Sequence, residues 1–148
     1  MVDFIVGPAS RQDFPRIRQL IRVVAINPTG LNWLHFLVAV TPENELLGCG
    51  QIKPHSDGSR ELASIAVVEH ARGMGVAREI IQELLKREQT RPLYLMCRAR
   101  LEPLYVKFGF RAIHAQEMPP YFQRISRVER IFNAKAPSGD RLMIMKLI

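Results

Sequence analysis

Apolar and polar residues follow one another in short blocks along the 148-residue chain, and these blocks have two different periods. Apolar runs that are typical of strands lie at Phe4–Val6, Trp33–Val40, Glu45–Pro54, Glu61–Val68, Leu93–Cys97, Phe110–His114 and Arg141–Ile148. Segments that we interpret as helices lie at Phe14–Val24, Val76–Leu85, Leu101–Phe108 and Tyr121–Phe132. The pattern therefore predicts a protein that contains both strands and amphipathic helices.

The turns between these segments predict how they connect. Ser10 and Asp13 are expected to cap the first helix, and Thr41–Asn44 to join two strands as a hairpin. After a second turn at His55–Ser59, a strand, a helix and a return strand follow one another. We therefore predict one domain over residues 1–148 with an α/β (α+β) fold, a mixed and mostly antiparallel sheet with a central strand-helix-strand crossover and flanking helices.

The stretch from Glu61 to Leu85 carries the most specific pattern. An apolar strand leads into a turn, His70–Gly75, that contains two glycines, and a helix follows at Val76. The first turn of a helix has unpaired backbone N–H groups and the positive end of the helix dipole, and glycines let a phosphate approach the main chain. The sequence therefore predicts an anion-binding turn here.

Composition restricts the class of protein. The hydrophobic fraction of 47% and the charged fraction of 24% are those of an ordinary folded domain and argue against disorder. No apolar run reaches the roughly 18 residues that cross a bilayer, and the N-terminus lacks a basic region followed by an apolar stretch. We expect no membrane association and a cytoplasmic location.

Cysteine and histidine usage argues against thiol and metal chemistry. Cys49 and Cys97 lie inside apolar segments predicted as strands, so buried free thiols are expected. The four histidines are scattered, and there is no CxxC or HExxH spacing. We therefore predict no metal site.

Two motifs resemble those of a known family. Arg72–Ala77 resembles the (Arg/Gln)-x-x-Gly-x-(Gly/Ala) element of the GNAT superfamily of acyl-CoA-dependent N-acetyltransferases. Leu104–Phe110 resembles the Tyr-x-x-x-Gly-Phe segment of the same family, at the expected distance downstream. Two ordered motifs at the right separation are much harder to obtain by chance than either alone.

The resemblance implies that acetyl-CoA is the co-substrate and that the main chain binds it. In the family, a glycine turn wraps the pyrophosphate and the preceding strand pairs with the pantetheine arm. The corresponding residues are Ile65, Ala66, Val67, Arg72, Gly73, Met74, Gly75, Val76 and Ala77. The net charge of +7 would attract such an anion. Binding to nucleic acid is less well supported, because the basic residues are dispersed.

The resemblance also implies two catalytic side chains. Tyr105 matches the family tyrosine that protonates the leaving thiolate, and a phenol keeps its proton at neutral pH. Glu61 resembles the catalytic glutamate of the histone-acetylating branch. The two-residue repeat of a strand places it on the same face as Ile65 and Val67. A solvent-exposed glutamate at the end of a strand remains the alternative.

The implied function is transfer of an acetyl group from acetyl-CoA to a primary amine of a small-molecule or peptide acceptor, by direct attack. The alternative is a catalytically silent CoA-sensing or partner-binding module with the same fold. Arg98, Arg100 and Arg111 suggest an anionic acceptor, with surface roles as the alternative. The loop Ile26–Asn32 is either a substrate contact or a plain turn. The 115–140 insertion covers the acceptor pocket, makes a homodimer contact or packs on the sheet.

Overall fold

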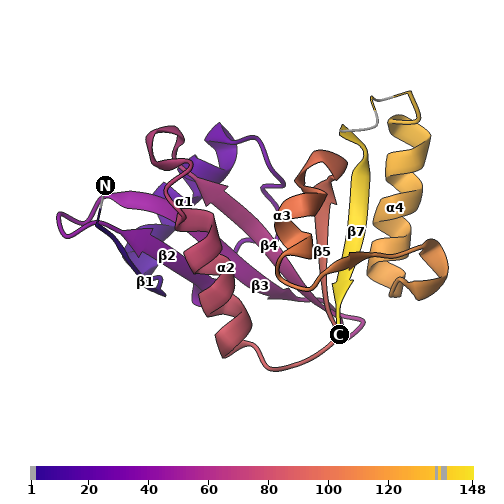
Figure 1. Cartoon of the computed structure of the whole chain (residues 1–148), viewed down its shortest axis with the longest axis horizontal. Helices are drawn as coiled ribbons and strands as arrows, with labels where there is room; N and C mark the ends of the chain where they lie inside the picture. The colour runs from indigo at the N-terminus through magenta and orange to yellow at the C-terminus, as the bar shows by residue number, and fades with distance from the viewer. Residues whose placement is uncertain (1–2, 136, 138–139) are drawn as a thin grey trace. The chain divides into compact units, whose positions relative to one another are not determined.

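The computed structural model describes residues 3–135, 137 and 140–148. The chain forms two compact units. The first unit contains Met1–Lys53 and Leu62–Gln89, and the second contains Pro54–Glu61 and Thr90–Ile148. Each unit combines strands with helices (Figure 1). The single domain expected over residues 1–148 stays a prediction.

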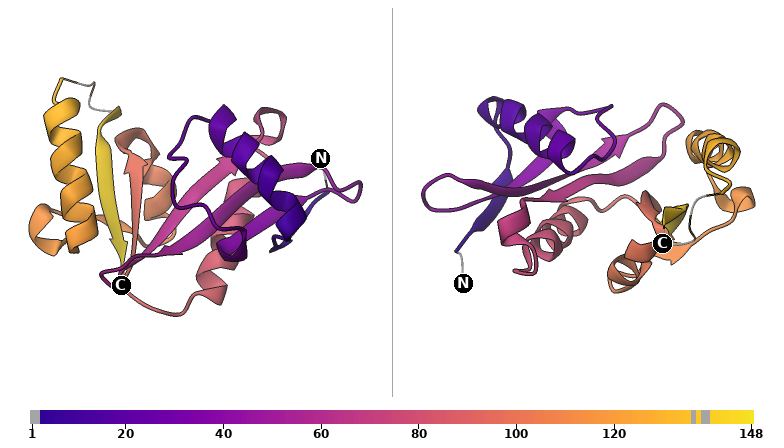
Figure 2. Two further views of the ribbon diagram at one scale, coloured as in Figure 1. Left: turned by 180° about the vertical axis from the view of Figure 1, so that it is seen from behind. Right: turned by 90° about the horizontal axis from the view of Figure 1, so that it is seen from above.

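The first unit has antiparallel strands in the order β1-β2-β3-β4 with a helix on each face (Figure 2, right). Its strands are β1 (Ile5–Pro8), β2 (Phe36–Val40), β3 (Leu46–Pro54) and β4 (Arg60–Val67), and its helices are α1 (Phe14–Val23) and α2 (Val76–Arg87). Buried residues of α1, β2 and β3 form one core, to which Ala66 of β4 contributes. The helices therefore cover both faces of the strands that carry the predicted cofactor site.

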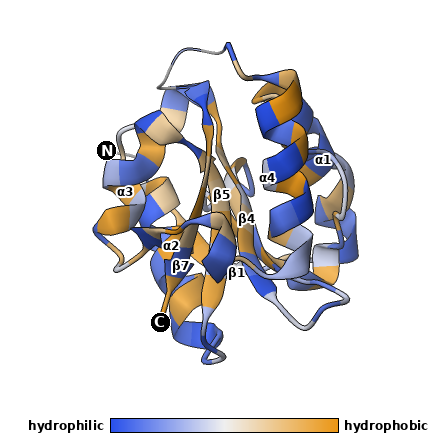
Figure 3. Ribbon diagram, turned by 90° about the vertical axis from the view of Figure 1, so that its right-hand side faces the viewer, coloured by the Kyte–Doolittle hydropathy of each residue, from blue (hydrophilic) through white to orange (hydrophobic). Residues whose placement is uncertain are grey.

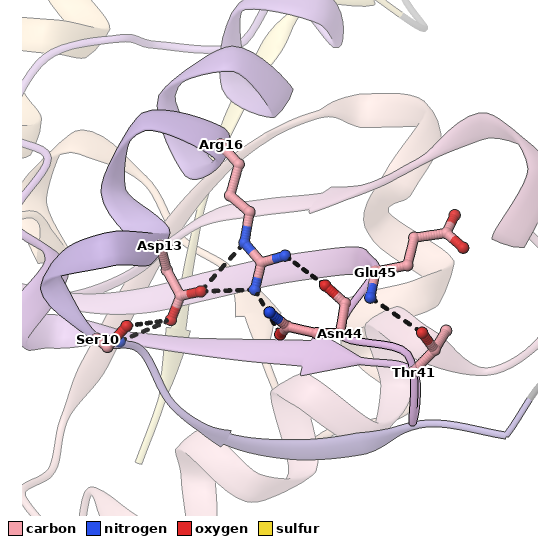
Figure 4. Close-up of polar contacts among 6 residues, drawn as sticks. All are labelled: Ser10, Asp13, Arg16, Thr41, Asn44 and Glu45. Atoms are coloured by element: carbon pink, nitrogen blue, oxygen red, sulfur yellow. Dashed lines mark hydrogen bonds and ion pairs between the residues drawn. The ribbon is translucent and has the colours of Figure 1, made fainter.

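Polar contacts fix the start of α1 and join it to the β2–β3 hairpin (Figure 4). The carboxylate of Asp13 accepts a hydrogen bond from the backbone N–H of Ser10 at 2.7 Å, which confirms the predicted capping arrangement. Arg16 pairs with Asp13 at 2.6 Å and donates to the carbonyl of Asn44 at 2.6 Å. Hydrogen bonds from Ser10 and Arg16 outweigh the effect of burial, so the pKa of Asp13 is lowered.

Two glycines of β3 let α2 pack closely against the strands. A Cβ added at Gly48 would lie 2.8 Å from the side chain of Val76, and one at Gly50 would lie 2.9 Å from that of Ile80. Both distances are too short for carbon atoms, so a larger residue would push the helix away. Close packing here fixes the first turn of α2 beside the end of β4.

The second unit contains β5 (Leu93–Arg98), β6 (Arg111–Ala112) and β7 (Leu142–Leu147), in the order β5-β7-β6. Helices α3 (Glu102–Val106) and α4 (Pro120–Phe132) lie on opposite faces of these strands (Figure 2, right). The strands β5 and β7 are mainly apolar, whereas α4 carries both polar and apolar residues (Figure 3). Tyr94, Ile113, Phe122 and Ile144 form the core beneath α4.

The predicted fold class is confirmed, since the described residues form seven mostly antiparallel strands and four α-helices. Two predicted strands are shorter than expected. Trp33–His35 is a 3-10 turn, because the side chain of Asn32 accepts a hydrogen bond from the N–H of Leu34 and caps it. In Phe110–His114, only Arg111–Ala112 pairs as a strand. Apolar content alone does not distinguish such turns from strands.

Both cysteines are buried and free, as predicted. Burial raises the pKa of Cys49 to about 12 and that of Cys97 to about 11, so both thiols stay protonated at neutral pH. Among the described residues, no group of three or more His, Cys, Asp or Glu side chains could hold a metal ion. A search of the same residues finds no helix with the length and apolar character that crossing a membrane requires.

Candidate functional site

Strand β4 departs from regular geometry at Ser64, whose φ is +60°. This left-handed conformation is unfavourable for a residue with a side chain, and it interrupts the alternation of strand faces. The expectation that Glu61 shares a face with Ile65 and Val67 therefore loses its basis. The hydroxyl of Ser64 accepts a hydrogen bond from Nε2 of Gln51 at 2.8 Å, and this contact holds the irregular strand against β3.

The buried amide of Gln51 also reaches the loop that precedes β2. Its Nε2 lies 3.3 Å from the carbonyl oxygen of Gly30, within the Ile26–Asn32 segment predicted as a substrate contact or a turn. The Oε1 atom of Gln51 is buried and has no hydrogen-bond partner among the described residues. Gln51 thus connects this loop to the strand that is expected to bind the cofactor.

The turn after β4 has the backbone that its glycines predict. Gly73 and Gly75 have φ values of +80° and +83°, which glycine adopts without strain. A Cβ added at Gly73 would meet no atom within 4 Å, so the turn faces open space there. Gly75 precedes α2, and its carbonyl accepts from the N–H of Glu79 at 3.0 Å.

This arrangement fits a pyrophosphate. The N–H groups of the first turn of a helix have no partner within the helix, and those of α2 follow directly on the open turn. Unpaired N–H groups at the start of a helix are the groups with which helices bind anions. The residues predicted to bind the cofactor, Ile65–Val67 and Arg72–Ala77, all lie in the first unit, on β4 and at the start of α2.

Glu61 lies in the second unit and is 2% exposed. The alternative of a solvent-exposed glutamate at the end of a strand is therefore wrong, because the carboxylate is buried. Its Oε1 lies 2.8 Å from Nε2 of His55, across the turn that joins β3 to β4. The ring of His55 stacks on Tyr121 of α4, with 3.7 Å between the ring centroids. Helix α4, which lies in the 115–140 insertion, thus packs onto the histidine that binds Glu61.

Tyr105 lies on α3 and is 7% exposed. Burial is the main cause of its raised pKa, to which the neighbouring Cys97 adds. The phenol therefore keeps its proton at neutral pH, as a general acid requires. Its ring packs edge-on against Phe110, which is a core residue as predicted. Gly109, whose φ is +97°, is the last residue between Tyr105 and Phe110 in the sequence.

Three arginines that suggested an anionic acceptor are paired with acidic side chains. Arg98 lies 2.8 Å from Glu129 of α4, and Arg100 lies 2.6 Å from Asp140. Arg111 pairs with Glu117 at 2.8 Å. These side chains tie the 115–140 insertion to the rest of the second unit, so their charge no longer supports an anionic acceptor.

Three residues of the site, His55, Gln51 and Ser64, were not identified from the sequence. His55 and Glu61 flank a short hairpin turn, and this position was the available signal for their contact. Gln51 is a polar residue in an otherwise apolar strand, which is a weaker signal. The left-handed conformation of Ser64 has no counterpart in the sequence, because serine is not a residue that this conformation favours.

The model of the acetyltransferase (GNAT) domain matches residues 32–112, more than half of the chain. The chain therefore belongs to the GNAT acetyltransferase family and is an acyltransferase. The matched range includes the glycine turn, Glu61 and Tyr105. Among curated protein sequences there is no significant match.

Solved structures share the fold at low sequence identity. Rv2747 from Mycobacterium tuberculosis, solved in complex with CoA, has a TM-score of 0.72 and 21% identity, over 97% of this chain and 98% of that one. N-acetylglutamate synthase from Neisseria gonorrhoeae, solved with CoA and N-acetyl-glutamate, has a TM-score of 0.75 and 18% identity; the match covers 99% of this chain but 35% of the synthase. Ard1 from Thermoplasma volcanium has a TM-score of 0.67 and 14% identity, over 99% of both chains.

Proposed function

We propose that this protein is an N-acetyltransferase that moves an acetyl group from acetyl-CoA to a primary amine of a small-molecule or peptide acceptor. The main support is the open glycine turn at Gly73–Gly75, which leads into the free N–H groups of α2. Two of the similar proteins, from M. tuberculosis and N. gonorrhoeae, were solved with CoA. A cytoplasmic location belongs to the same proposal.

The residues divide the chemistry among them. The N–H groups of Arg72–Ala77 bind the pyrophosphate, and the backbone of Ile65 and Val67 orients the pantetheine arm. When bound, acetyl-CoA supplies an acetyl group activated as a thioester. Glu61 takes a proton from the acceptor ammonium, so that the free amine can attack the thioester carbon. Tyr105 gives its proton to the sulfur as the C–S bond breaks, and the proton that the attacking nitrogen loses in becoming an amide restores the phenol.

The test combines calorimetric titration of acetyl-CoA with thiol release in the presence of a panel of amines. We expect saturable binding and thiol release that depends on the amine. Gly75→Val should weaken binding, because φ of +83° is strained for a β-branched residue. Gly7→Ala is the matched control, since an added Cβ there meets no atom within 4 Å. Absence of binding at low salt would overturn the proposal.

A second candidate is a CoA-binding module that does not transfer the acetyl group. The contact between Glu61 and His55 favours it, because one carboxylate oxygen is already engaged. This candidate predicts acetyl-CoA binding without thiol release, and Tyr105→Phe would leave every measurable property unchanged. The same pair of assays therefore separates the two candidates.

A further inference from the structure

A buried histidine contacts the proposed base, and no role has yet been assigned to it. The side chain of Glu61 is 3% exposed and that of His55 is 11% exposed, and the two are 2.8 Å apart. A carboxylate is costly to bury unless a donor satisfies it. An ionised carboxylate can only accept, so the tautomer that suits this contact carries its hydrogen on Nε2 of His55.

The ring of His55 is held in one orientation. Besides stacking on Tyr121 at an interplanar angle of 20°, it meets Phe122 edge-on, with 5.7 Å between centroids. The backbone N–H of His55 donates to the carbonyl of Ser59 at 2.9 Å, which fixes the turn beneath the ring. These contacts restrict the ring of His55, whose Nε2 lies against Glu61.

The same turn also fixes the helix that supplies these aromatic rings. Helix α4 begins at Pro120, and the residue at its N-cap, Pro119, has no side chain that can cap it. Asp57 of the turn provides the cap instead, since its Oδ2 accepts from the N–H of Tyr121 at 3.0 Å. The negative charge also lies at the positive end of the helix dipole. The turn and α4 thus hold one another, with His55 between them.

We propose that His55 is a positioning residue for acetyl transfer, and that its Nε2–H donates to the carboxylate of Glu61 and orients it to receive the proton of the acceptor amine. This inference rests on the proposed function. The acceptor R–NH3+ gives one proton to the carboxylate of Glu61 and becomes R–NH2, while the Nε2–H bond of His55 stays intact. The helix α4 takes part only by keeping the ring in place.

Charged and titratable groups face His55 from each element that packs against it. Glu61 and Asp57 face it from β4 and from the turn. From α4 it meets Tyr121, whose pKa is raised by burial and by Glu61, while Arg124 acts in the opposite direction. Two acidic side chains therefore lie close to the ring of His55, one of them in direct contact with its Nε2.

Two variants separate the hydrogen bond from the packing. His55→Phe keeps a ring that can stack on Tyr121 but has no N–H, whereas His55→Gln keeps an N–H donor and lacks the ring. We expect His55→Phe to lower kcat by about tenfold or more with an unchanged KM for acetyl-CoA, and to move the acidic limb of its pH profile to higher pH. His55→Gln should keep the acidic side of the pH profile where it is in the wild type. The positioning role would be overturned if His55→Phe had the kcat and the pH profile of the wild type. It would also be overturned if both variants lost the same activity and neither changed the pH profile.

A measurement without turnover tests the pair directly. The Nε2–H signal of His55, followed by proton NMR at one pH, should be protected from exchange with water in the wild type and lose this protection in Glu61→Leu, because that variant removes the acceptor. An equally protected signal in Glu61→Leu would overturn the inference. A wild-type protein that binds acetyl-CoA and releases no thiol with any amine would refute the proposed transfer, and the positioning role with it. A loss confined to the His55 variants leaves the transfer standing.

Discussion

The hairpin of β3 and β4 carries two buried polar pairs, one in each unit, and they differ in how fully their atoms are satisfied. In the first unit, Gln51 donates to Ser64 and leaves its own Oε1 without a partner among the described residues. In the second, His55 and Glu61 meet at 2.8 Å under the cover of Tyr121. The two pairs are a few residues apart in the sequence; Gln51 and Ser64 lie on β3 and β4, whereas His55 directly follows β3 and Glu61 lies near the start of β4.

Charge explains why the two pairs differ in how fully their polar atoms are satisfied. An unpaired amide oxygen in the interior costs about 1–3 kcal/mol, which a folded domain can tolerate. An unpaired buried carboxylate costs several kcal/mol, so Glu61 needs its donor. The comparison therefore indicates that the stability of the hairpin depends more on His55 than on Gln51, and variants can test this ranking.

The largest expected effect is that of His55→Leu. It removes the donor and leaves the carboxylate of Glu61 buried, which should lower the free energy of unfolding at pH 8 by about 3 kcal/mol. Urea denaturation measures the change. The double variant His55→Leu, Glu61→Gln should recover most of the loss, because the amide carries no charge. A single variant as stable as the wild type would remove the basis of the comparison.

Ser64 gives the next effect, through its backbone. Ser64→Gly and Ser64→Ala both remove the hydroxyl that accepts from Gln51, but only glycine adopts φ of +60° without strain. We expect Ser64→Gly to be more stable than Ser64→Ala by about 1 kcal/mol in thermal unfolding. Equal stabilities would mean that the left-handed conformation carries no strain.

Gln51→Leu should have a smaller effect, below about 1 kcal/mol. The replacement eliminates the unpaired Oε1, which should raise the stability. It also leaves the hydroxyl of Ser64 and the carbonyl of Gly30 without the donor of Gln51, which should lower the stability. The same urea measurement as for His55→Leu makes the two replacements directly comparable. A loss as large as that of His55→Leu would show that charge is not what separates the two pairs.

The smallest effect concerns pH. Although burial acts to raise it, the pKa of Asp57 is lowered overall, because Ser59 and the N–H of Tyr121 donate to the carboxylate. A folded-state pKa below the unfolded value of 3.8 stabilises the protein above that value, and this stabilisation is lost as the pH falls through the folded pKa.

Asp57→Asn should therefore flatten the decline of stability as the pH falls below about 4, with a loss of about 0.5 kcal/mol at neutral pH, at the low end for a helix cap. Denaturation curves at a series of pH values measure both quantities. Asp13→Asn is the corresponding variant in the first unit, where the carboxylate also has a lowered pKa. An unchanged slope in Asp57→Asn would contradict the assigned cap.

The sequence predicted the elements of the fold well, because periodicity and turn residues are local properties. The helix α2 and the glycine turn before it follow directly from residue spacing. The contacts of Glu61 were not predicted, since they depend on which residues α4 brings onto the turn after β3. The argument for a shared face of Glu61 and Ile65 lost its basis for a related reason, as the irregularity at Ser64 is stabilised by another strand.

The cap that Asp57 gives to α4 has a consequence for how this protein can change over evolutionary time. The acid and the helix start are 64 residues apart, yet neither has a reason to persist without the other. A lineage that lost the helix would be free to replace Asp57, and one that acquired a Ser or Asp in place of Pro119 would be equally free. The two segments should therefore be inherited as a pair.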